Sequence, residues 1–190
     1  MTRIVSGFAR SLTLQVPPRG TRPTSDRVRE AIFSALEARD AVMGAHVLDL
    51  YAGTGALGLE AASRGASSVT LVEAQRDAAA VCSRNGAAVH AMAPAGSKPT
   101  IRVLTDRVDN VVRHRGEPVD LVFVDPPYAL SNDELHAVLD ALTEHMNEDA
   151  IVCVERSTRD AMVHLPEGMT MTWSRSYGDT IVFFLERVAD

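Results

Sequence analysis

Polar and apolar residues follow two different spacings along the chain, and the change falls near residue 45. Residues 11–16 alternate strictly, which is the pattern of a half-buried strand, and residues 3–6 form its expected partner with Gly7 near the turn. After a stretch broken by prolines, Thr24 and Ser25 are suitable caps for a helix. Its expected inner face holds Val28, Ala31, Ile32, Ala35 and Leu36.

Beyond residue 45, short apolar runs alternate with helical patterns. The runs predict strands at 46–50, 68–72, 101–104, 119–124 and 150–154. Helices are expected at 56–64, 75–85, 108–115 and 131–145, the last opened by a capping box of Ser131 and Glu134. Such alternation implies a parallel sheet that is covered on both faces. The chain then ends in a hairpin of 170–176 and 180–187, and residues 86–99 are expected to be a flexible surface loop.

The chain has 190 residues, which suits one α/β domain with a small appendage. No apolar run reaches the roughly 18 residues of a membrane helix. Its two cysteines, Cys82 and Cys153, fall in a predicted helix and a predicted strand, where they form no disulfide framework. We therefore expect a cytoplasmic protein without a membrane segment.

Positive charge is concentrated at the start of the chain. The net charge is −6, yet residues 1–30 hold six arginines against only Asp26 and Glu30. Arginine-rich termini are often merely solvated, but a segment so rich in arginine also suits the binding of phosphates. The candidate RNA-binding residues are Arg3, Arg10, Arg19, Arg22, Arg27 and Arg29.

A glycine-rich turn follows the first strand of the α/β region. Its spacing, Gly53-x-Gly55-x-x-Gly58, is shared with dinucleotide-binding dehydrogenases and is ambiguous alone. Two features favour S-adenosylmethionine (SAM). Asp49 lies four residues before Gly53, where it can face the cationic amino-acid end of SAM, and no lysine or arginine is present in the turn for a pyrophosphate. Glu73 ends the second strand, where its carboxylate suits ribose hydroxyls, and Asp106 follows the third, placed for the adenine amino group or as a helix cap.

The fourth strand ends in Asp125-Pro126-Pro127-Tyr128, at the sheet edge where ligands bind in parallel α/β folds. The exocyclic nitrogen of a base is a poor nucleophile, because its lone pair is delocalised into the ring. The Asp125 carboxylate and the Pro126 carbonyl can accept hydrogen bonds from that amino group and stabilise the charge that develops on it. Pro126 and Pro127 hold the acceptors rigidly, and Tyr128 offers a face on which an extruded base can stack.

With both motifs placed, the chain resembles the RsmD-type methyltransferases, which modify N2 of one guanine in bacterial small-subunit (16S) ribosomal RNA. The resemblance covers nearly the whole chain and is most specific at residues 21–33; residues 48–61, 63–66 and 177–180 also match closely. It implies a Rossmann-like class I methyltransferase fold: a mostly parallel seven-stranded sheet with an antiparallel last strand, plus a small N-terminal β-hairpin. Residues 1–20 are then the hairpin and RNA-binding arm, and residues 21–190 the SAM-dependent methyltransferase domain.

By this resemblance, the N-terminal hairpin and Arg22–Arg29 engage 16S rRNA, within the small ribosomal subunit or an assembly intermediate. We also expect the protein to be a monomer. The expected SAM-binding residues are Asp49, Tyr51, Gly53, Thr54, Gly55, Glu73, Asp106 and Thr24. Residues 7–12 depart from the family, whose opening hairpin carries a more basic turn; here only Arg10 is basic.

Other functions share parts of this pattern. Related motifs serve amino-methyltransferases that act on adenine N6 or on a protein amide. The glycine turn alone also fits an NAD-dependent oxidoreductase, and the arginines fit a non-catalytic RNA-binding assembly factor. The six histidines are scattered without metal-ligand spacing, so we expect no metal site.

Overall fold

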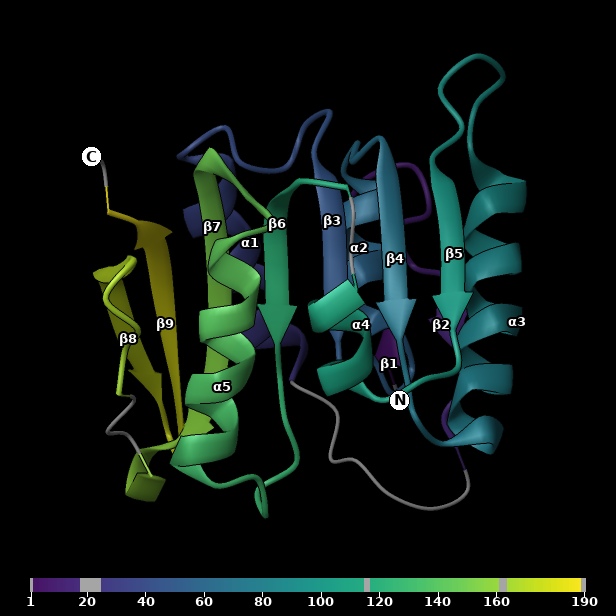
Figure 1. Ribbon diagram of the computed structural model, residues 1–190. Coiled ribbons are helices and arrows are strands. Elements are labelled where there is room, and N and C mark those ends of the chain that lie inside the picture. Colours follow the sequence, from purple (N-terminus) through teal and green to yellow (C-terminus); the bar gives the residue numbers. More distant parts are fainter. Residues whose placement is uncertain (1, 18–24, 115–116, 161–163, 189–190) are drawn as a thin grey trace.

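A computed structural model describes residues 2–17, 25–114, 117–160 and 164–188. Five parallel strands form most of its central sheet: β3 (His46–Leu50), β4 (Ser68–Val72), β5 (Thr100–Leu104), β6 (Val119–Val124) and β7 (Met146–Ser157). The hairpin of β8 (Met169–Tyr177) and β9 (Thr180–Arg187) completes it. The seven strands lie in the order β5-β4-β3-β6-β7-β9-β8, and β9 is antiparallel to both of its neighbours (Figure 1). The predicted mostly parallel sheet with an antiparallel last strand is confirmed.

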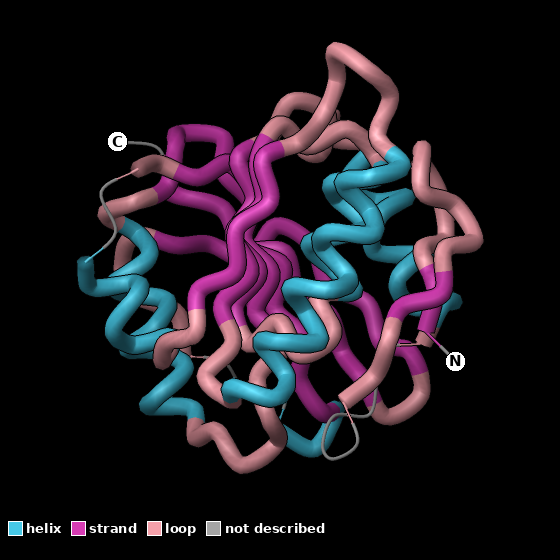
Figure 2. Tube along the Cα trace, turned by 90° about the vertical axis from the view of Figure 1, so that its right-hand side faces the viewer, coloured by secondary structure: helices cyan, strands magenta, loops and turns pink. Residues whose placement is uncertain are grey.

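Helices cover both faces of this sheet (Figure 2). Helices α1 (Asp26–Glu37), α2 (Ala56–Ser63) and α3 (Arg76–Met92) pack into one hydrophobic core, and α4 (Val108–His114) and α5 (Asn132–Thr143) into the other. A short 3₁₀ helix, Thr158–Asp160, follows β7. None of the described helices combines the length and the apolar character needed to cross a lipid bilayer.

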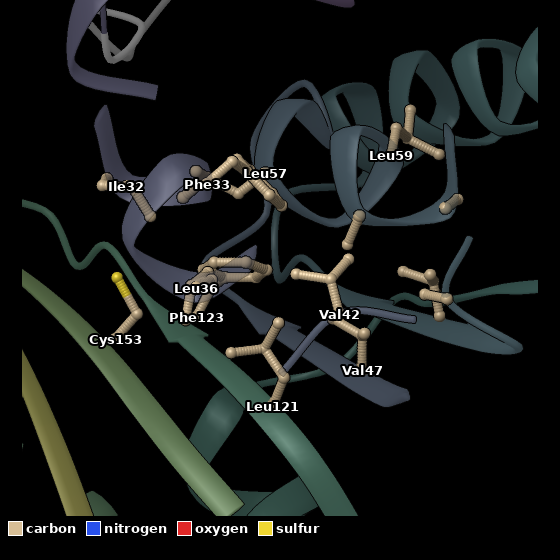
Figure 3. Packing of buried hydrophobic residues seen from close by; sticks show 14 of the residues in the cluster. Ile32, Phe33, Leu36, Val42, Val47, Leu57, Leu59, Leu121, Phe123 and Cys153 are labelled. Carbon is tan, nitrogen blue, oxygen red and sulfur yellow. The ribbon is translucent and has the colours of Figure 1, made fainter. Parts of the chain in front are cut away.

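The first of these cores is centred on aromatic and branched side chains between α1 and the sheet (Figure 3). The rings of Phe33 and Phe123 lie 5.6 Å apart between centroids in a tilted arrangement, and both are fully buried. Replacing such a ring by alanine typically costs about 3–5 kcal/mol of folding free energy. Because Phe123 lies on β6 two residues before Asp125, this packing also fixes the strand that ends at the predicted catalytic motif.

The expected flexible loop over residues 86–99 is wrong in its first half, because α3 continues to Met92. Gly86 allows this continuation: a Cβ there would come within 3.1 Å of Ile101 Cγ2, so the missing side chain lets the helix lie close to β5. Val89 is fully buried one turn later and fixes the extension to the core. Strand β7 is likewise longer than the predicted 150–154.

The N-terminal hairpin consists of β1 (Thr2–Arg3) and β2 (Thr13–Leu14), paired antiparallel as predicted. It is seated on α2, where the fully buried Glu60 carboxylate accepts hydrogen bonds from the backbone amides of Val5 at 2.7 Å and Ser6 at 2.9 Å. Ser63 Oγ accepts another from the Ala9 amide. The hairpin is therefore held by buried contacts to the same helix that begins at the glycine turn.

Candidate active site

A cavity of about 710 Å³ opens where the parallel strands of the sheet end. Strand β3 lies between β4 and β6, with Leu50 paired to Val72 on one side and to Val124 on the other. Residues that follow these three strands therefore meet at one edge, the lower edge of the view in Figure 1. Asp49, Glu73 and Asp125 all lie on the wall of the cavity, as the sequence predicted from their places at strand ends.

The glycine turn bends the chain from β3 into α2 through left-handed backbone conformations. Tyr51, Gly53 and Gly55 have φ angles of 62°, 55° and 79°, and the first two residues line the cavity. Glu73 holds the turn, since its carboxylate accepts hydrogen bonds from the Gly53 amide at 3.0 Å and the Gln75 amide at 2.8 Å. Gly58 has a different role: a Cβ there would come within 2.5 Å of Leu71 Cδ2, so this glycine lets α2 pack on the sheet.

Asp49 lies beneath the turn and is only 2% exposed. Its carboxylate accepts a hydrogen bond from the Gly58 amide at 2.8 Å. Burial raises the pKa of Asp49 to about 7, and the negative charges of Asp125 and Glu73 add to the rise, while the Gly58 amide opposes it. A cation bound in the cavity therefore favours the ionised form of this carboxylate.

The predicted catalytic residues form a turn that directly follows the C-terminal end of β6. Asp125 is half-buried and Pro126 is buried, whereas Pro127 and Tyr128 face outward. The Leu130 amide donates to the Pro127 carbonyl at 2.9 Å and closes the turn around Tyr128, whose side chain is 69% exposed. The motif therefore places a partly sheltered carboxylate beside an open aromatic face.

Most of the predicted cofactor residues line this cavity, including Tyr51 and Thr54, but not all of them do. Gly55 is the N-cap of α2. Asp106 is exposed and accepts hydrogen bonds from the Arg107 amide at 2.7 Å and Asn110 Nδ2 at 3.0 Å, so it organises the start of α4. Thr24 lies outside the described residues.

Several residues of the cavity wall were not identified from the sequence. Four of them come from the segments that follow β5 and β6, one from the end of β7 and one from the start of β9: Arg107, Asp109, Arg113, Glu134, Arg156 and Thr180. Burial raises the pKa of Tyr51 to about 12, helped by the charges of Asp109 and Glu134. Arg107 and Asp109 follow a predicted strand closely, so their positions could have identified them as candidate site residues. Arg156 lies inside a strand and gave no such signal.

The candidate RNA-binding arginines divide into exposed and buried residues. Arg3, Arg10 and Arg27 are exposed, and Arg19 and Arg22 lie outside the described residues. The expectation for Arg29 is corrected, because its side chain is fully buried in α1. Its guanidinium donates to the Arg3 carbonyl and to Asp26 Oδ1, the latter at 2.8 Å, and desolvation lowers its pKa. Arg29 lies on the inner face of the helix, where it ties the hairpin to α1.

The cavity fits SAM in size and in charge. Ligand sites of this kind are about 300–1,000 Å³ in volume. The carboxylates of Asp49 and Glu73 give the inner wall an acidic character that suits a sulfonium and an ammonium group. At the wall formed by α4, the cations Arg107 and Arg113 are paired with Asp109 at 2.9 and 3.4 Å. The sheet order and this cavity, together with the relatives described next, define the chain as a Rossmann-like, SAM-dependent methyltransferase.

Comparison with known proteins places the chain within that class. The family described as "Conserved hypothetical protein 95" matches residues 2–186, and the chain belongs to this family, the RsmD-type rRNA methyltransferases. "Ribosomal RNA small subunit methyltransferase D" of Escherichia coli K12 is 31% identical over 190 residues, which cover 98% of this chain and 90% of that protein.

Solved structures agree with this placement. A putative methyltransferase from Escherichia coli has a TM-score of 0.84 and 30% identity, with 100% of this chain and 99% of that one covered. The magnesium protoporphyrin IX methyltransferase of Synechocystis, solved with bound SAM, shares the fold alone: its TM-score is 0.66 at 16% identity, with 89% and 87% of the two chains covered.

Proposed function

We propose that the protein transfers a methyl group from SAM to the exocyclic N2 of one guanine in small-subunit (16S) rRNA. The observation that carries this proposal is the meeting of the glycine turn and Asp125 in one cavity, at the adjacent ends of β3 and β6. The acidic inner wall supports the choice of cofactor. The names of the full-length relatives support the choice of rRNA.

When bound, SAM supplies an electrophilic methyl group. The Asp125 carboxylate and the Pro126 carbonyl accept hydrogen bonds from the amino group of the base, which directs the nitrogen lone pair toward the cavity. As the N–C bond formed, the bond between the methyl carbon and the sulfonium sulfur would break and release S-adenosylhomocysteine. The Asp125 carboxylate would stabilise the positive charge that develops on nitrogen and accept its proton, which then passes to solvent. Tyr128 lies at the open side of this carboxylate, where its exposed ring supports an extruded base by stacking.

On the RNA side, we assign residues 1–20 to the arm that contacts the substrate, with Arg3 and Arg10 as its exposed cations among the described residues. Arg27, which is exposed on α1, is a further candidate beside the arm. The acceptor is rRNA assembled in a small ribosomal subunit or its precursor. In this proposal the enzyme acts in the cytoplasm as a monomer.

Methyl transfer tests the proposal directly. The purified chain is incubated with methyl-labelled SAM and either naked 16S rRNA or small subunits, both from cells that lack the mark. Mass spectrometry of the digested product then locates the methyl group. We expect N2-methylguanine at one site. Label on adenine N6 or on protein would refute the substrate, and no label on either RNA form would refute the activity.

An Asp125→Ala variant tests the assigned role. Removing a group that acts at the developing charge should lower turnover at least about 100-fold. Because that group belongs to the base side of the cavity, we expect SAM affinity to change less than about threefold. Asp120→Asn is the matched control: Asp120 lies near the opposite end of the same strand, where it accepts a hydrogen bond from the His46 amide. This control should methylate normally.

A further inference from the structure

Arg156 is a charged residue buried near the end of β7, with only 7% of its surface exposed, and it lies on the cavity wall. Its guanidinium makes two hydrogen bonds to the segment that follows the catalytic motif. Nη1 donates to the Leu130 carbonyl at 3.1 Å, and Nη2 donates to Asn132 Oδ1 at 3.2 Å. The side chain therefore connects the sheet to the far end of the loop that contains Tyr128.

These two hydrogen bonds hold the far end of the loop that joins β6 to α5, residues 125–131. At its near end, the chain leaves β6 after Val124, which is hydrogen-bonded within the sheet. At its far end, the Leu130 amide bonds to the Pro127 carbonyl, and Ser131 caps α5. Without Arg156, the Leu130 carbonyl loses its hydrogen bond to the sheet, and this end of the loop keeps only the packing of the Leu130 side chain and the bonds of the turn and the helix cap among the described contacts.

The burial of this guanidinium is not explained by packing alone. Its Nε is buried and has no hydrogen-bond partner within the part of the chain that the structure describes. A buried donor without a partner is unfavourable, and an aliphatic side chain of similar volume fills such a position at a lower desolvation cost. A role in holding the loop accounts for the charged residue.

We propose that Arg156 is a positioning residue for the transfer reaction: through Leu130 and Asn132 it holds Tyr128 and Asp125 in a fixed relation. The inference rests on the proposed function, since it concerns the placement of the accepting base. Displacement of a reacting group by about 1 Å can cost about 100-fold in rate, so loss of the two hydrogen bonds should act on the transfer step.

Two substitutions test this role. Arg156→Met keeps an unbranched side chain similar to the aliphatic stem of arginine and removes both hydrogen bonds, and it should lower kcat about 10- to 100-fold while SAM affinity stays within about twofold. Arg156→Lys can restore one of the two bonds and should recover part of the loss. Arg159→Met removes an exposed positive charge three residues later and should leave kcat unchanged.

A double-mutant cycle with Tyr128→Ala links the effect to the loop. If Arg156 acts by placing that ring, Arg156→Met should cost little in the Tyr128→Ala background. Full additivity of the two losses, or a matching loss of SAM affinity in Arg156→Met alone, would overturn the proposal.

Hydrogen exchange provides a readout that does not depend on the substrate. The backbone amides of residues 128–132 should exchange faster in Arg156→Met than in the wild type, with α3 unchanged as an internal reference. Unchanged exchange would overturn the positioning role. A wild-type protein that fails to methylate rRNA would instead overturn the proposed function, and the exchange result would still report on the contact.

Discussion

Asp49 on β3 caps helix α2 across the glycine turn. Its carboxylate accepts a hydrogen bond from the amide of Gly58, the third residue of the helix. The N-cap residue, Gly55, has no side chain for this purpose, so the strand supplies the acceptor that a capping side chain would normally provide. The same carboxylate thus orients the helix and adds negative charge beneath the cofactor cavity.

This buried carboxylate should make stability depend on pH. Its pKa is raised from 3.8 to about 7 in the folded protein. Stability from an acid with a raised pKa is fully present below its unfolded pKa and is lost as the pH rises through the folded value, here between about pH 4 and pH 7. The full effect corresponds to roughly 4 kcal/mol.

Asp49→Asn removes the titration and keeps an oxygen for the Gly58 amide. Urea unfolding at several values from about pH 5 to pH 8 should show the variant gaining stability relative to the wild type as the pH rises. The difference should level off above about pH 8. Parallel stability curves would mean that Asp49 does not titrate in this range.

Glu73 should control SAM affinity through the shape of the glycine turn. Glu73→Gln leaves one side-chain oxygen to serve the amides of both Gly53 and Gln75, which now bond to separate carboxylate oxygens. Hydrogen bonds to a charged group are worth about 1.5–3 kcal/mol, so we expect a loss of about 10-fold or more in SAM affinity by calorimetry. Glu148→Gln, at an exposed position near the start of β7, should bind SAM as the wild type does; equal losses in both variants would exclude a specific role for Glu73.

The sequence located residues of the cavity wall where these lie at strand ends. Asp49, Glu73 and Asp125 each end or follow an apolar run, and the parallel sheet brings such positions to one edge whatever the details of packing. The Gly53 turn could be placed for the same reason. These predictions needed only the order of elements.

Predictions failed where the result depended on which side of a helix faces the core. Arg29 was grouped with the other arginines by composition, yet it lies one residue from Val28 on the buried face of α1. The small residues after Gly86 resembled a loop, although the missing Cβ allows close helix packing. Arg156 required knowledge of a contact between residues 26 positions apart, which no local pattern contains.

Glu60 should stabilise the hairpin far more than Glu37 does, although both carboxylates pair with Arg64. Arg64 pairs with Glu60, which is fully buried, at 2.7 Å, and with Glu37, which is 49% exposed, at 3.0 Å. Breaking a buried pair typically costs about 3–5 kcal/mol, and an exposed pair contributes about 0–1 kcal/mol. Glu60→Gln also weakens the acceptor for the Val5 and Ser6 amides.

Urea unfolding of Glu60→Gln and Glu37→Gln measures this contrast. We expect a loss of several kcal/mol in the first and less than about 1 kcal/mol in the second. Amide exchange of residues 4–9 should accelerate only in Glu60→Gln. Similar costs for the two variants would show that the hairpin does not depend on the buried carboxylate.

Substitutions of the exposed arginines should weaken RNA binding, whereas substitution of the buried Arg29 should not. Arg10 and Arg27 are exposed. Each of them that contacts a phosphate should add about 1 to the steepness with which the logarithm of RNA affinity falls as the logarithm of salt concentration rises. Arg10→Ala and Arg27→Ala should each reduce that slope and leave unfolding free energy within about 0.5 kcal/mol. Fluorescence anisotropy with a labelled 16S rRNA fragment at several salt concentrations measures it.

Arg29→Met should instead lower stability and leave the salt dependence of RNA binding unchanged. Its guanidinium bonds to the Arg3 carbonyl and to Asp26, so the substitution should lower unfolding free energy by about 1–3 kcal/mol. Because Arg29 is fully buried, the salt slope of the folded variant should equal that of the wild type. A reduced slope with unchanged stability would place Arg29 at the RNA surface after all, and α1 would then have to turn its inner face outward when RNA binds.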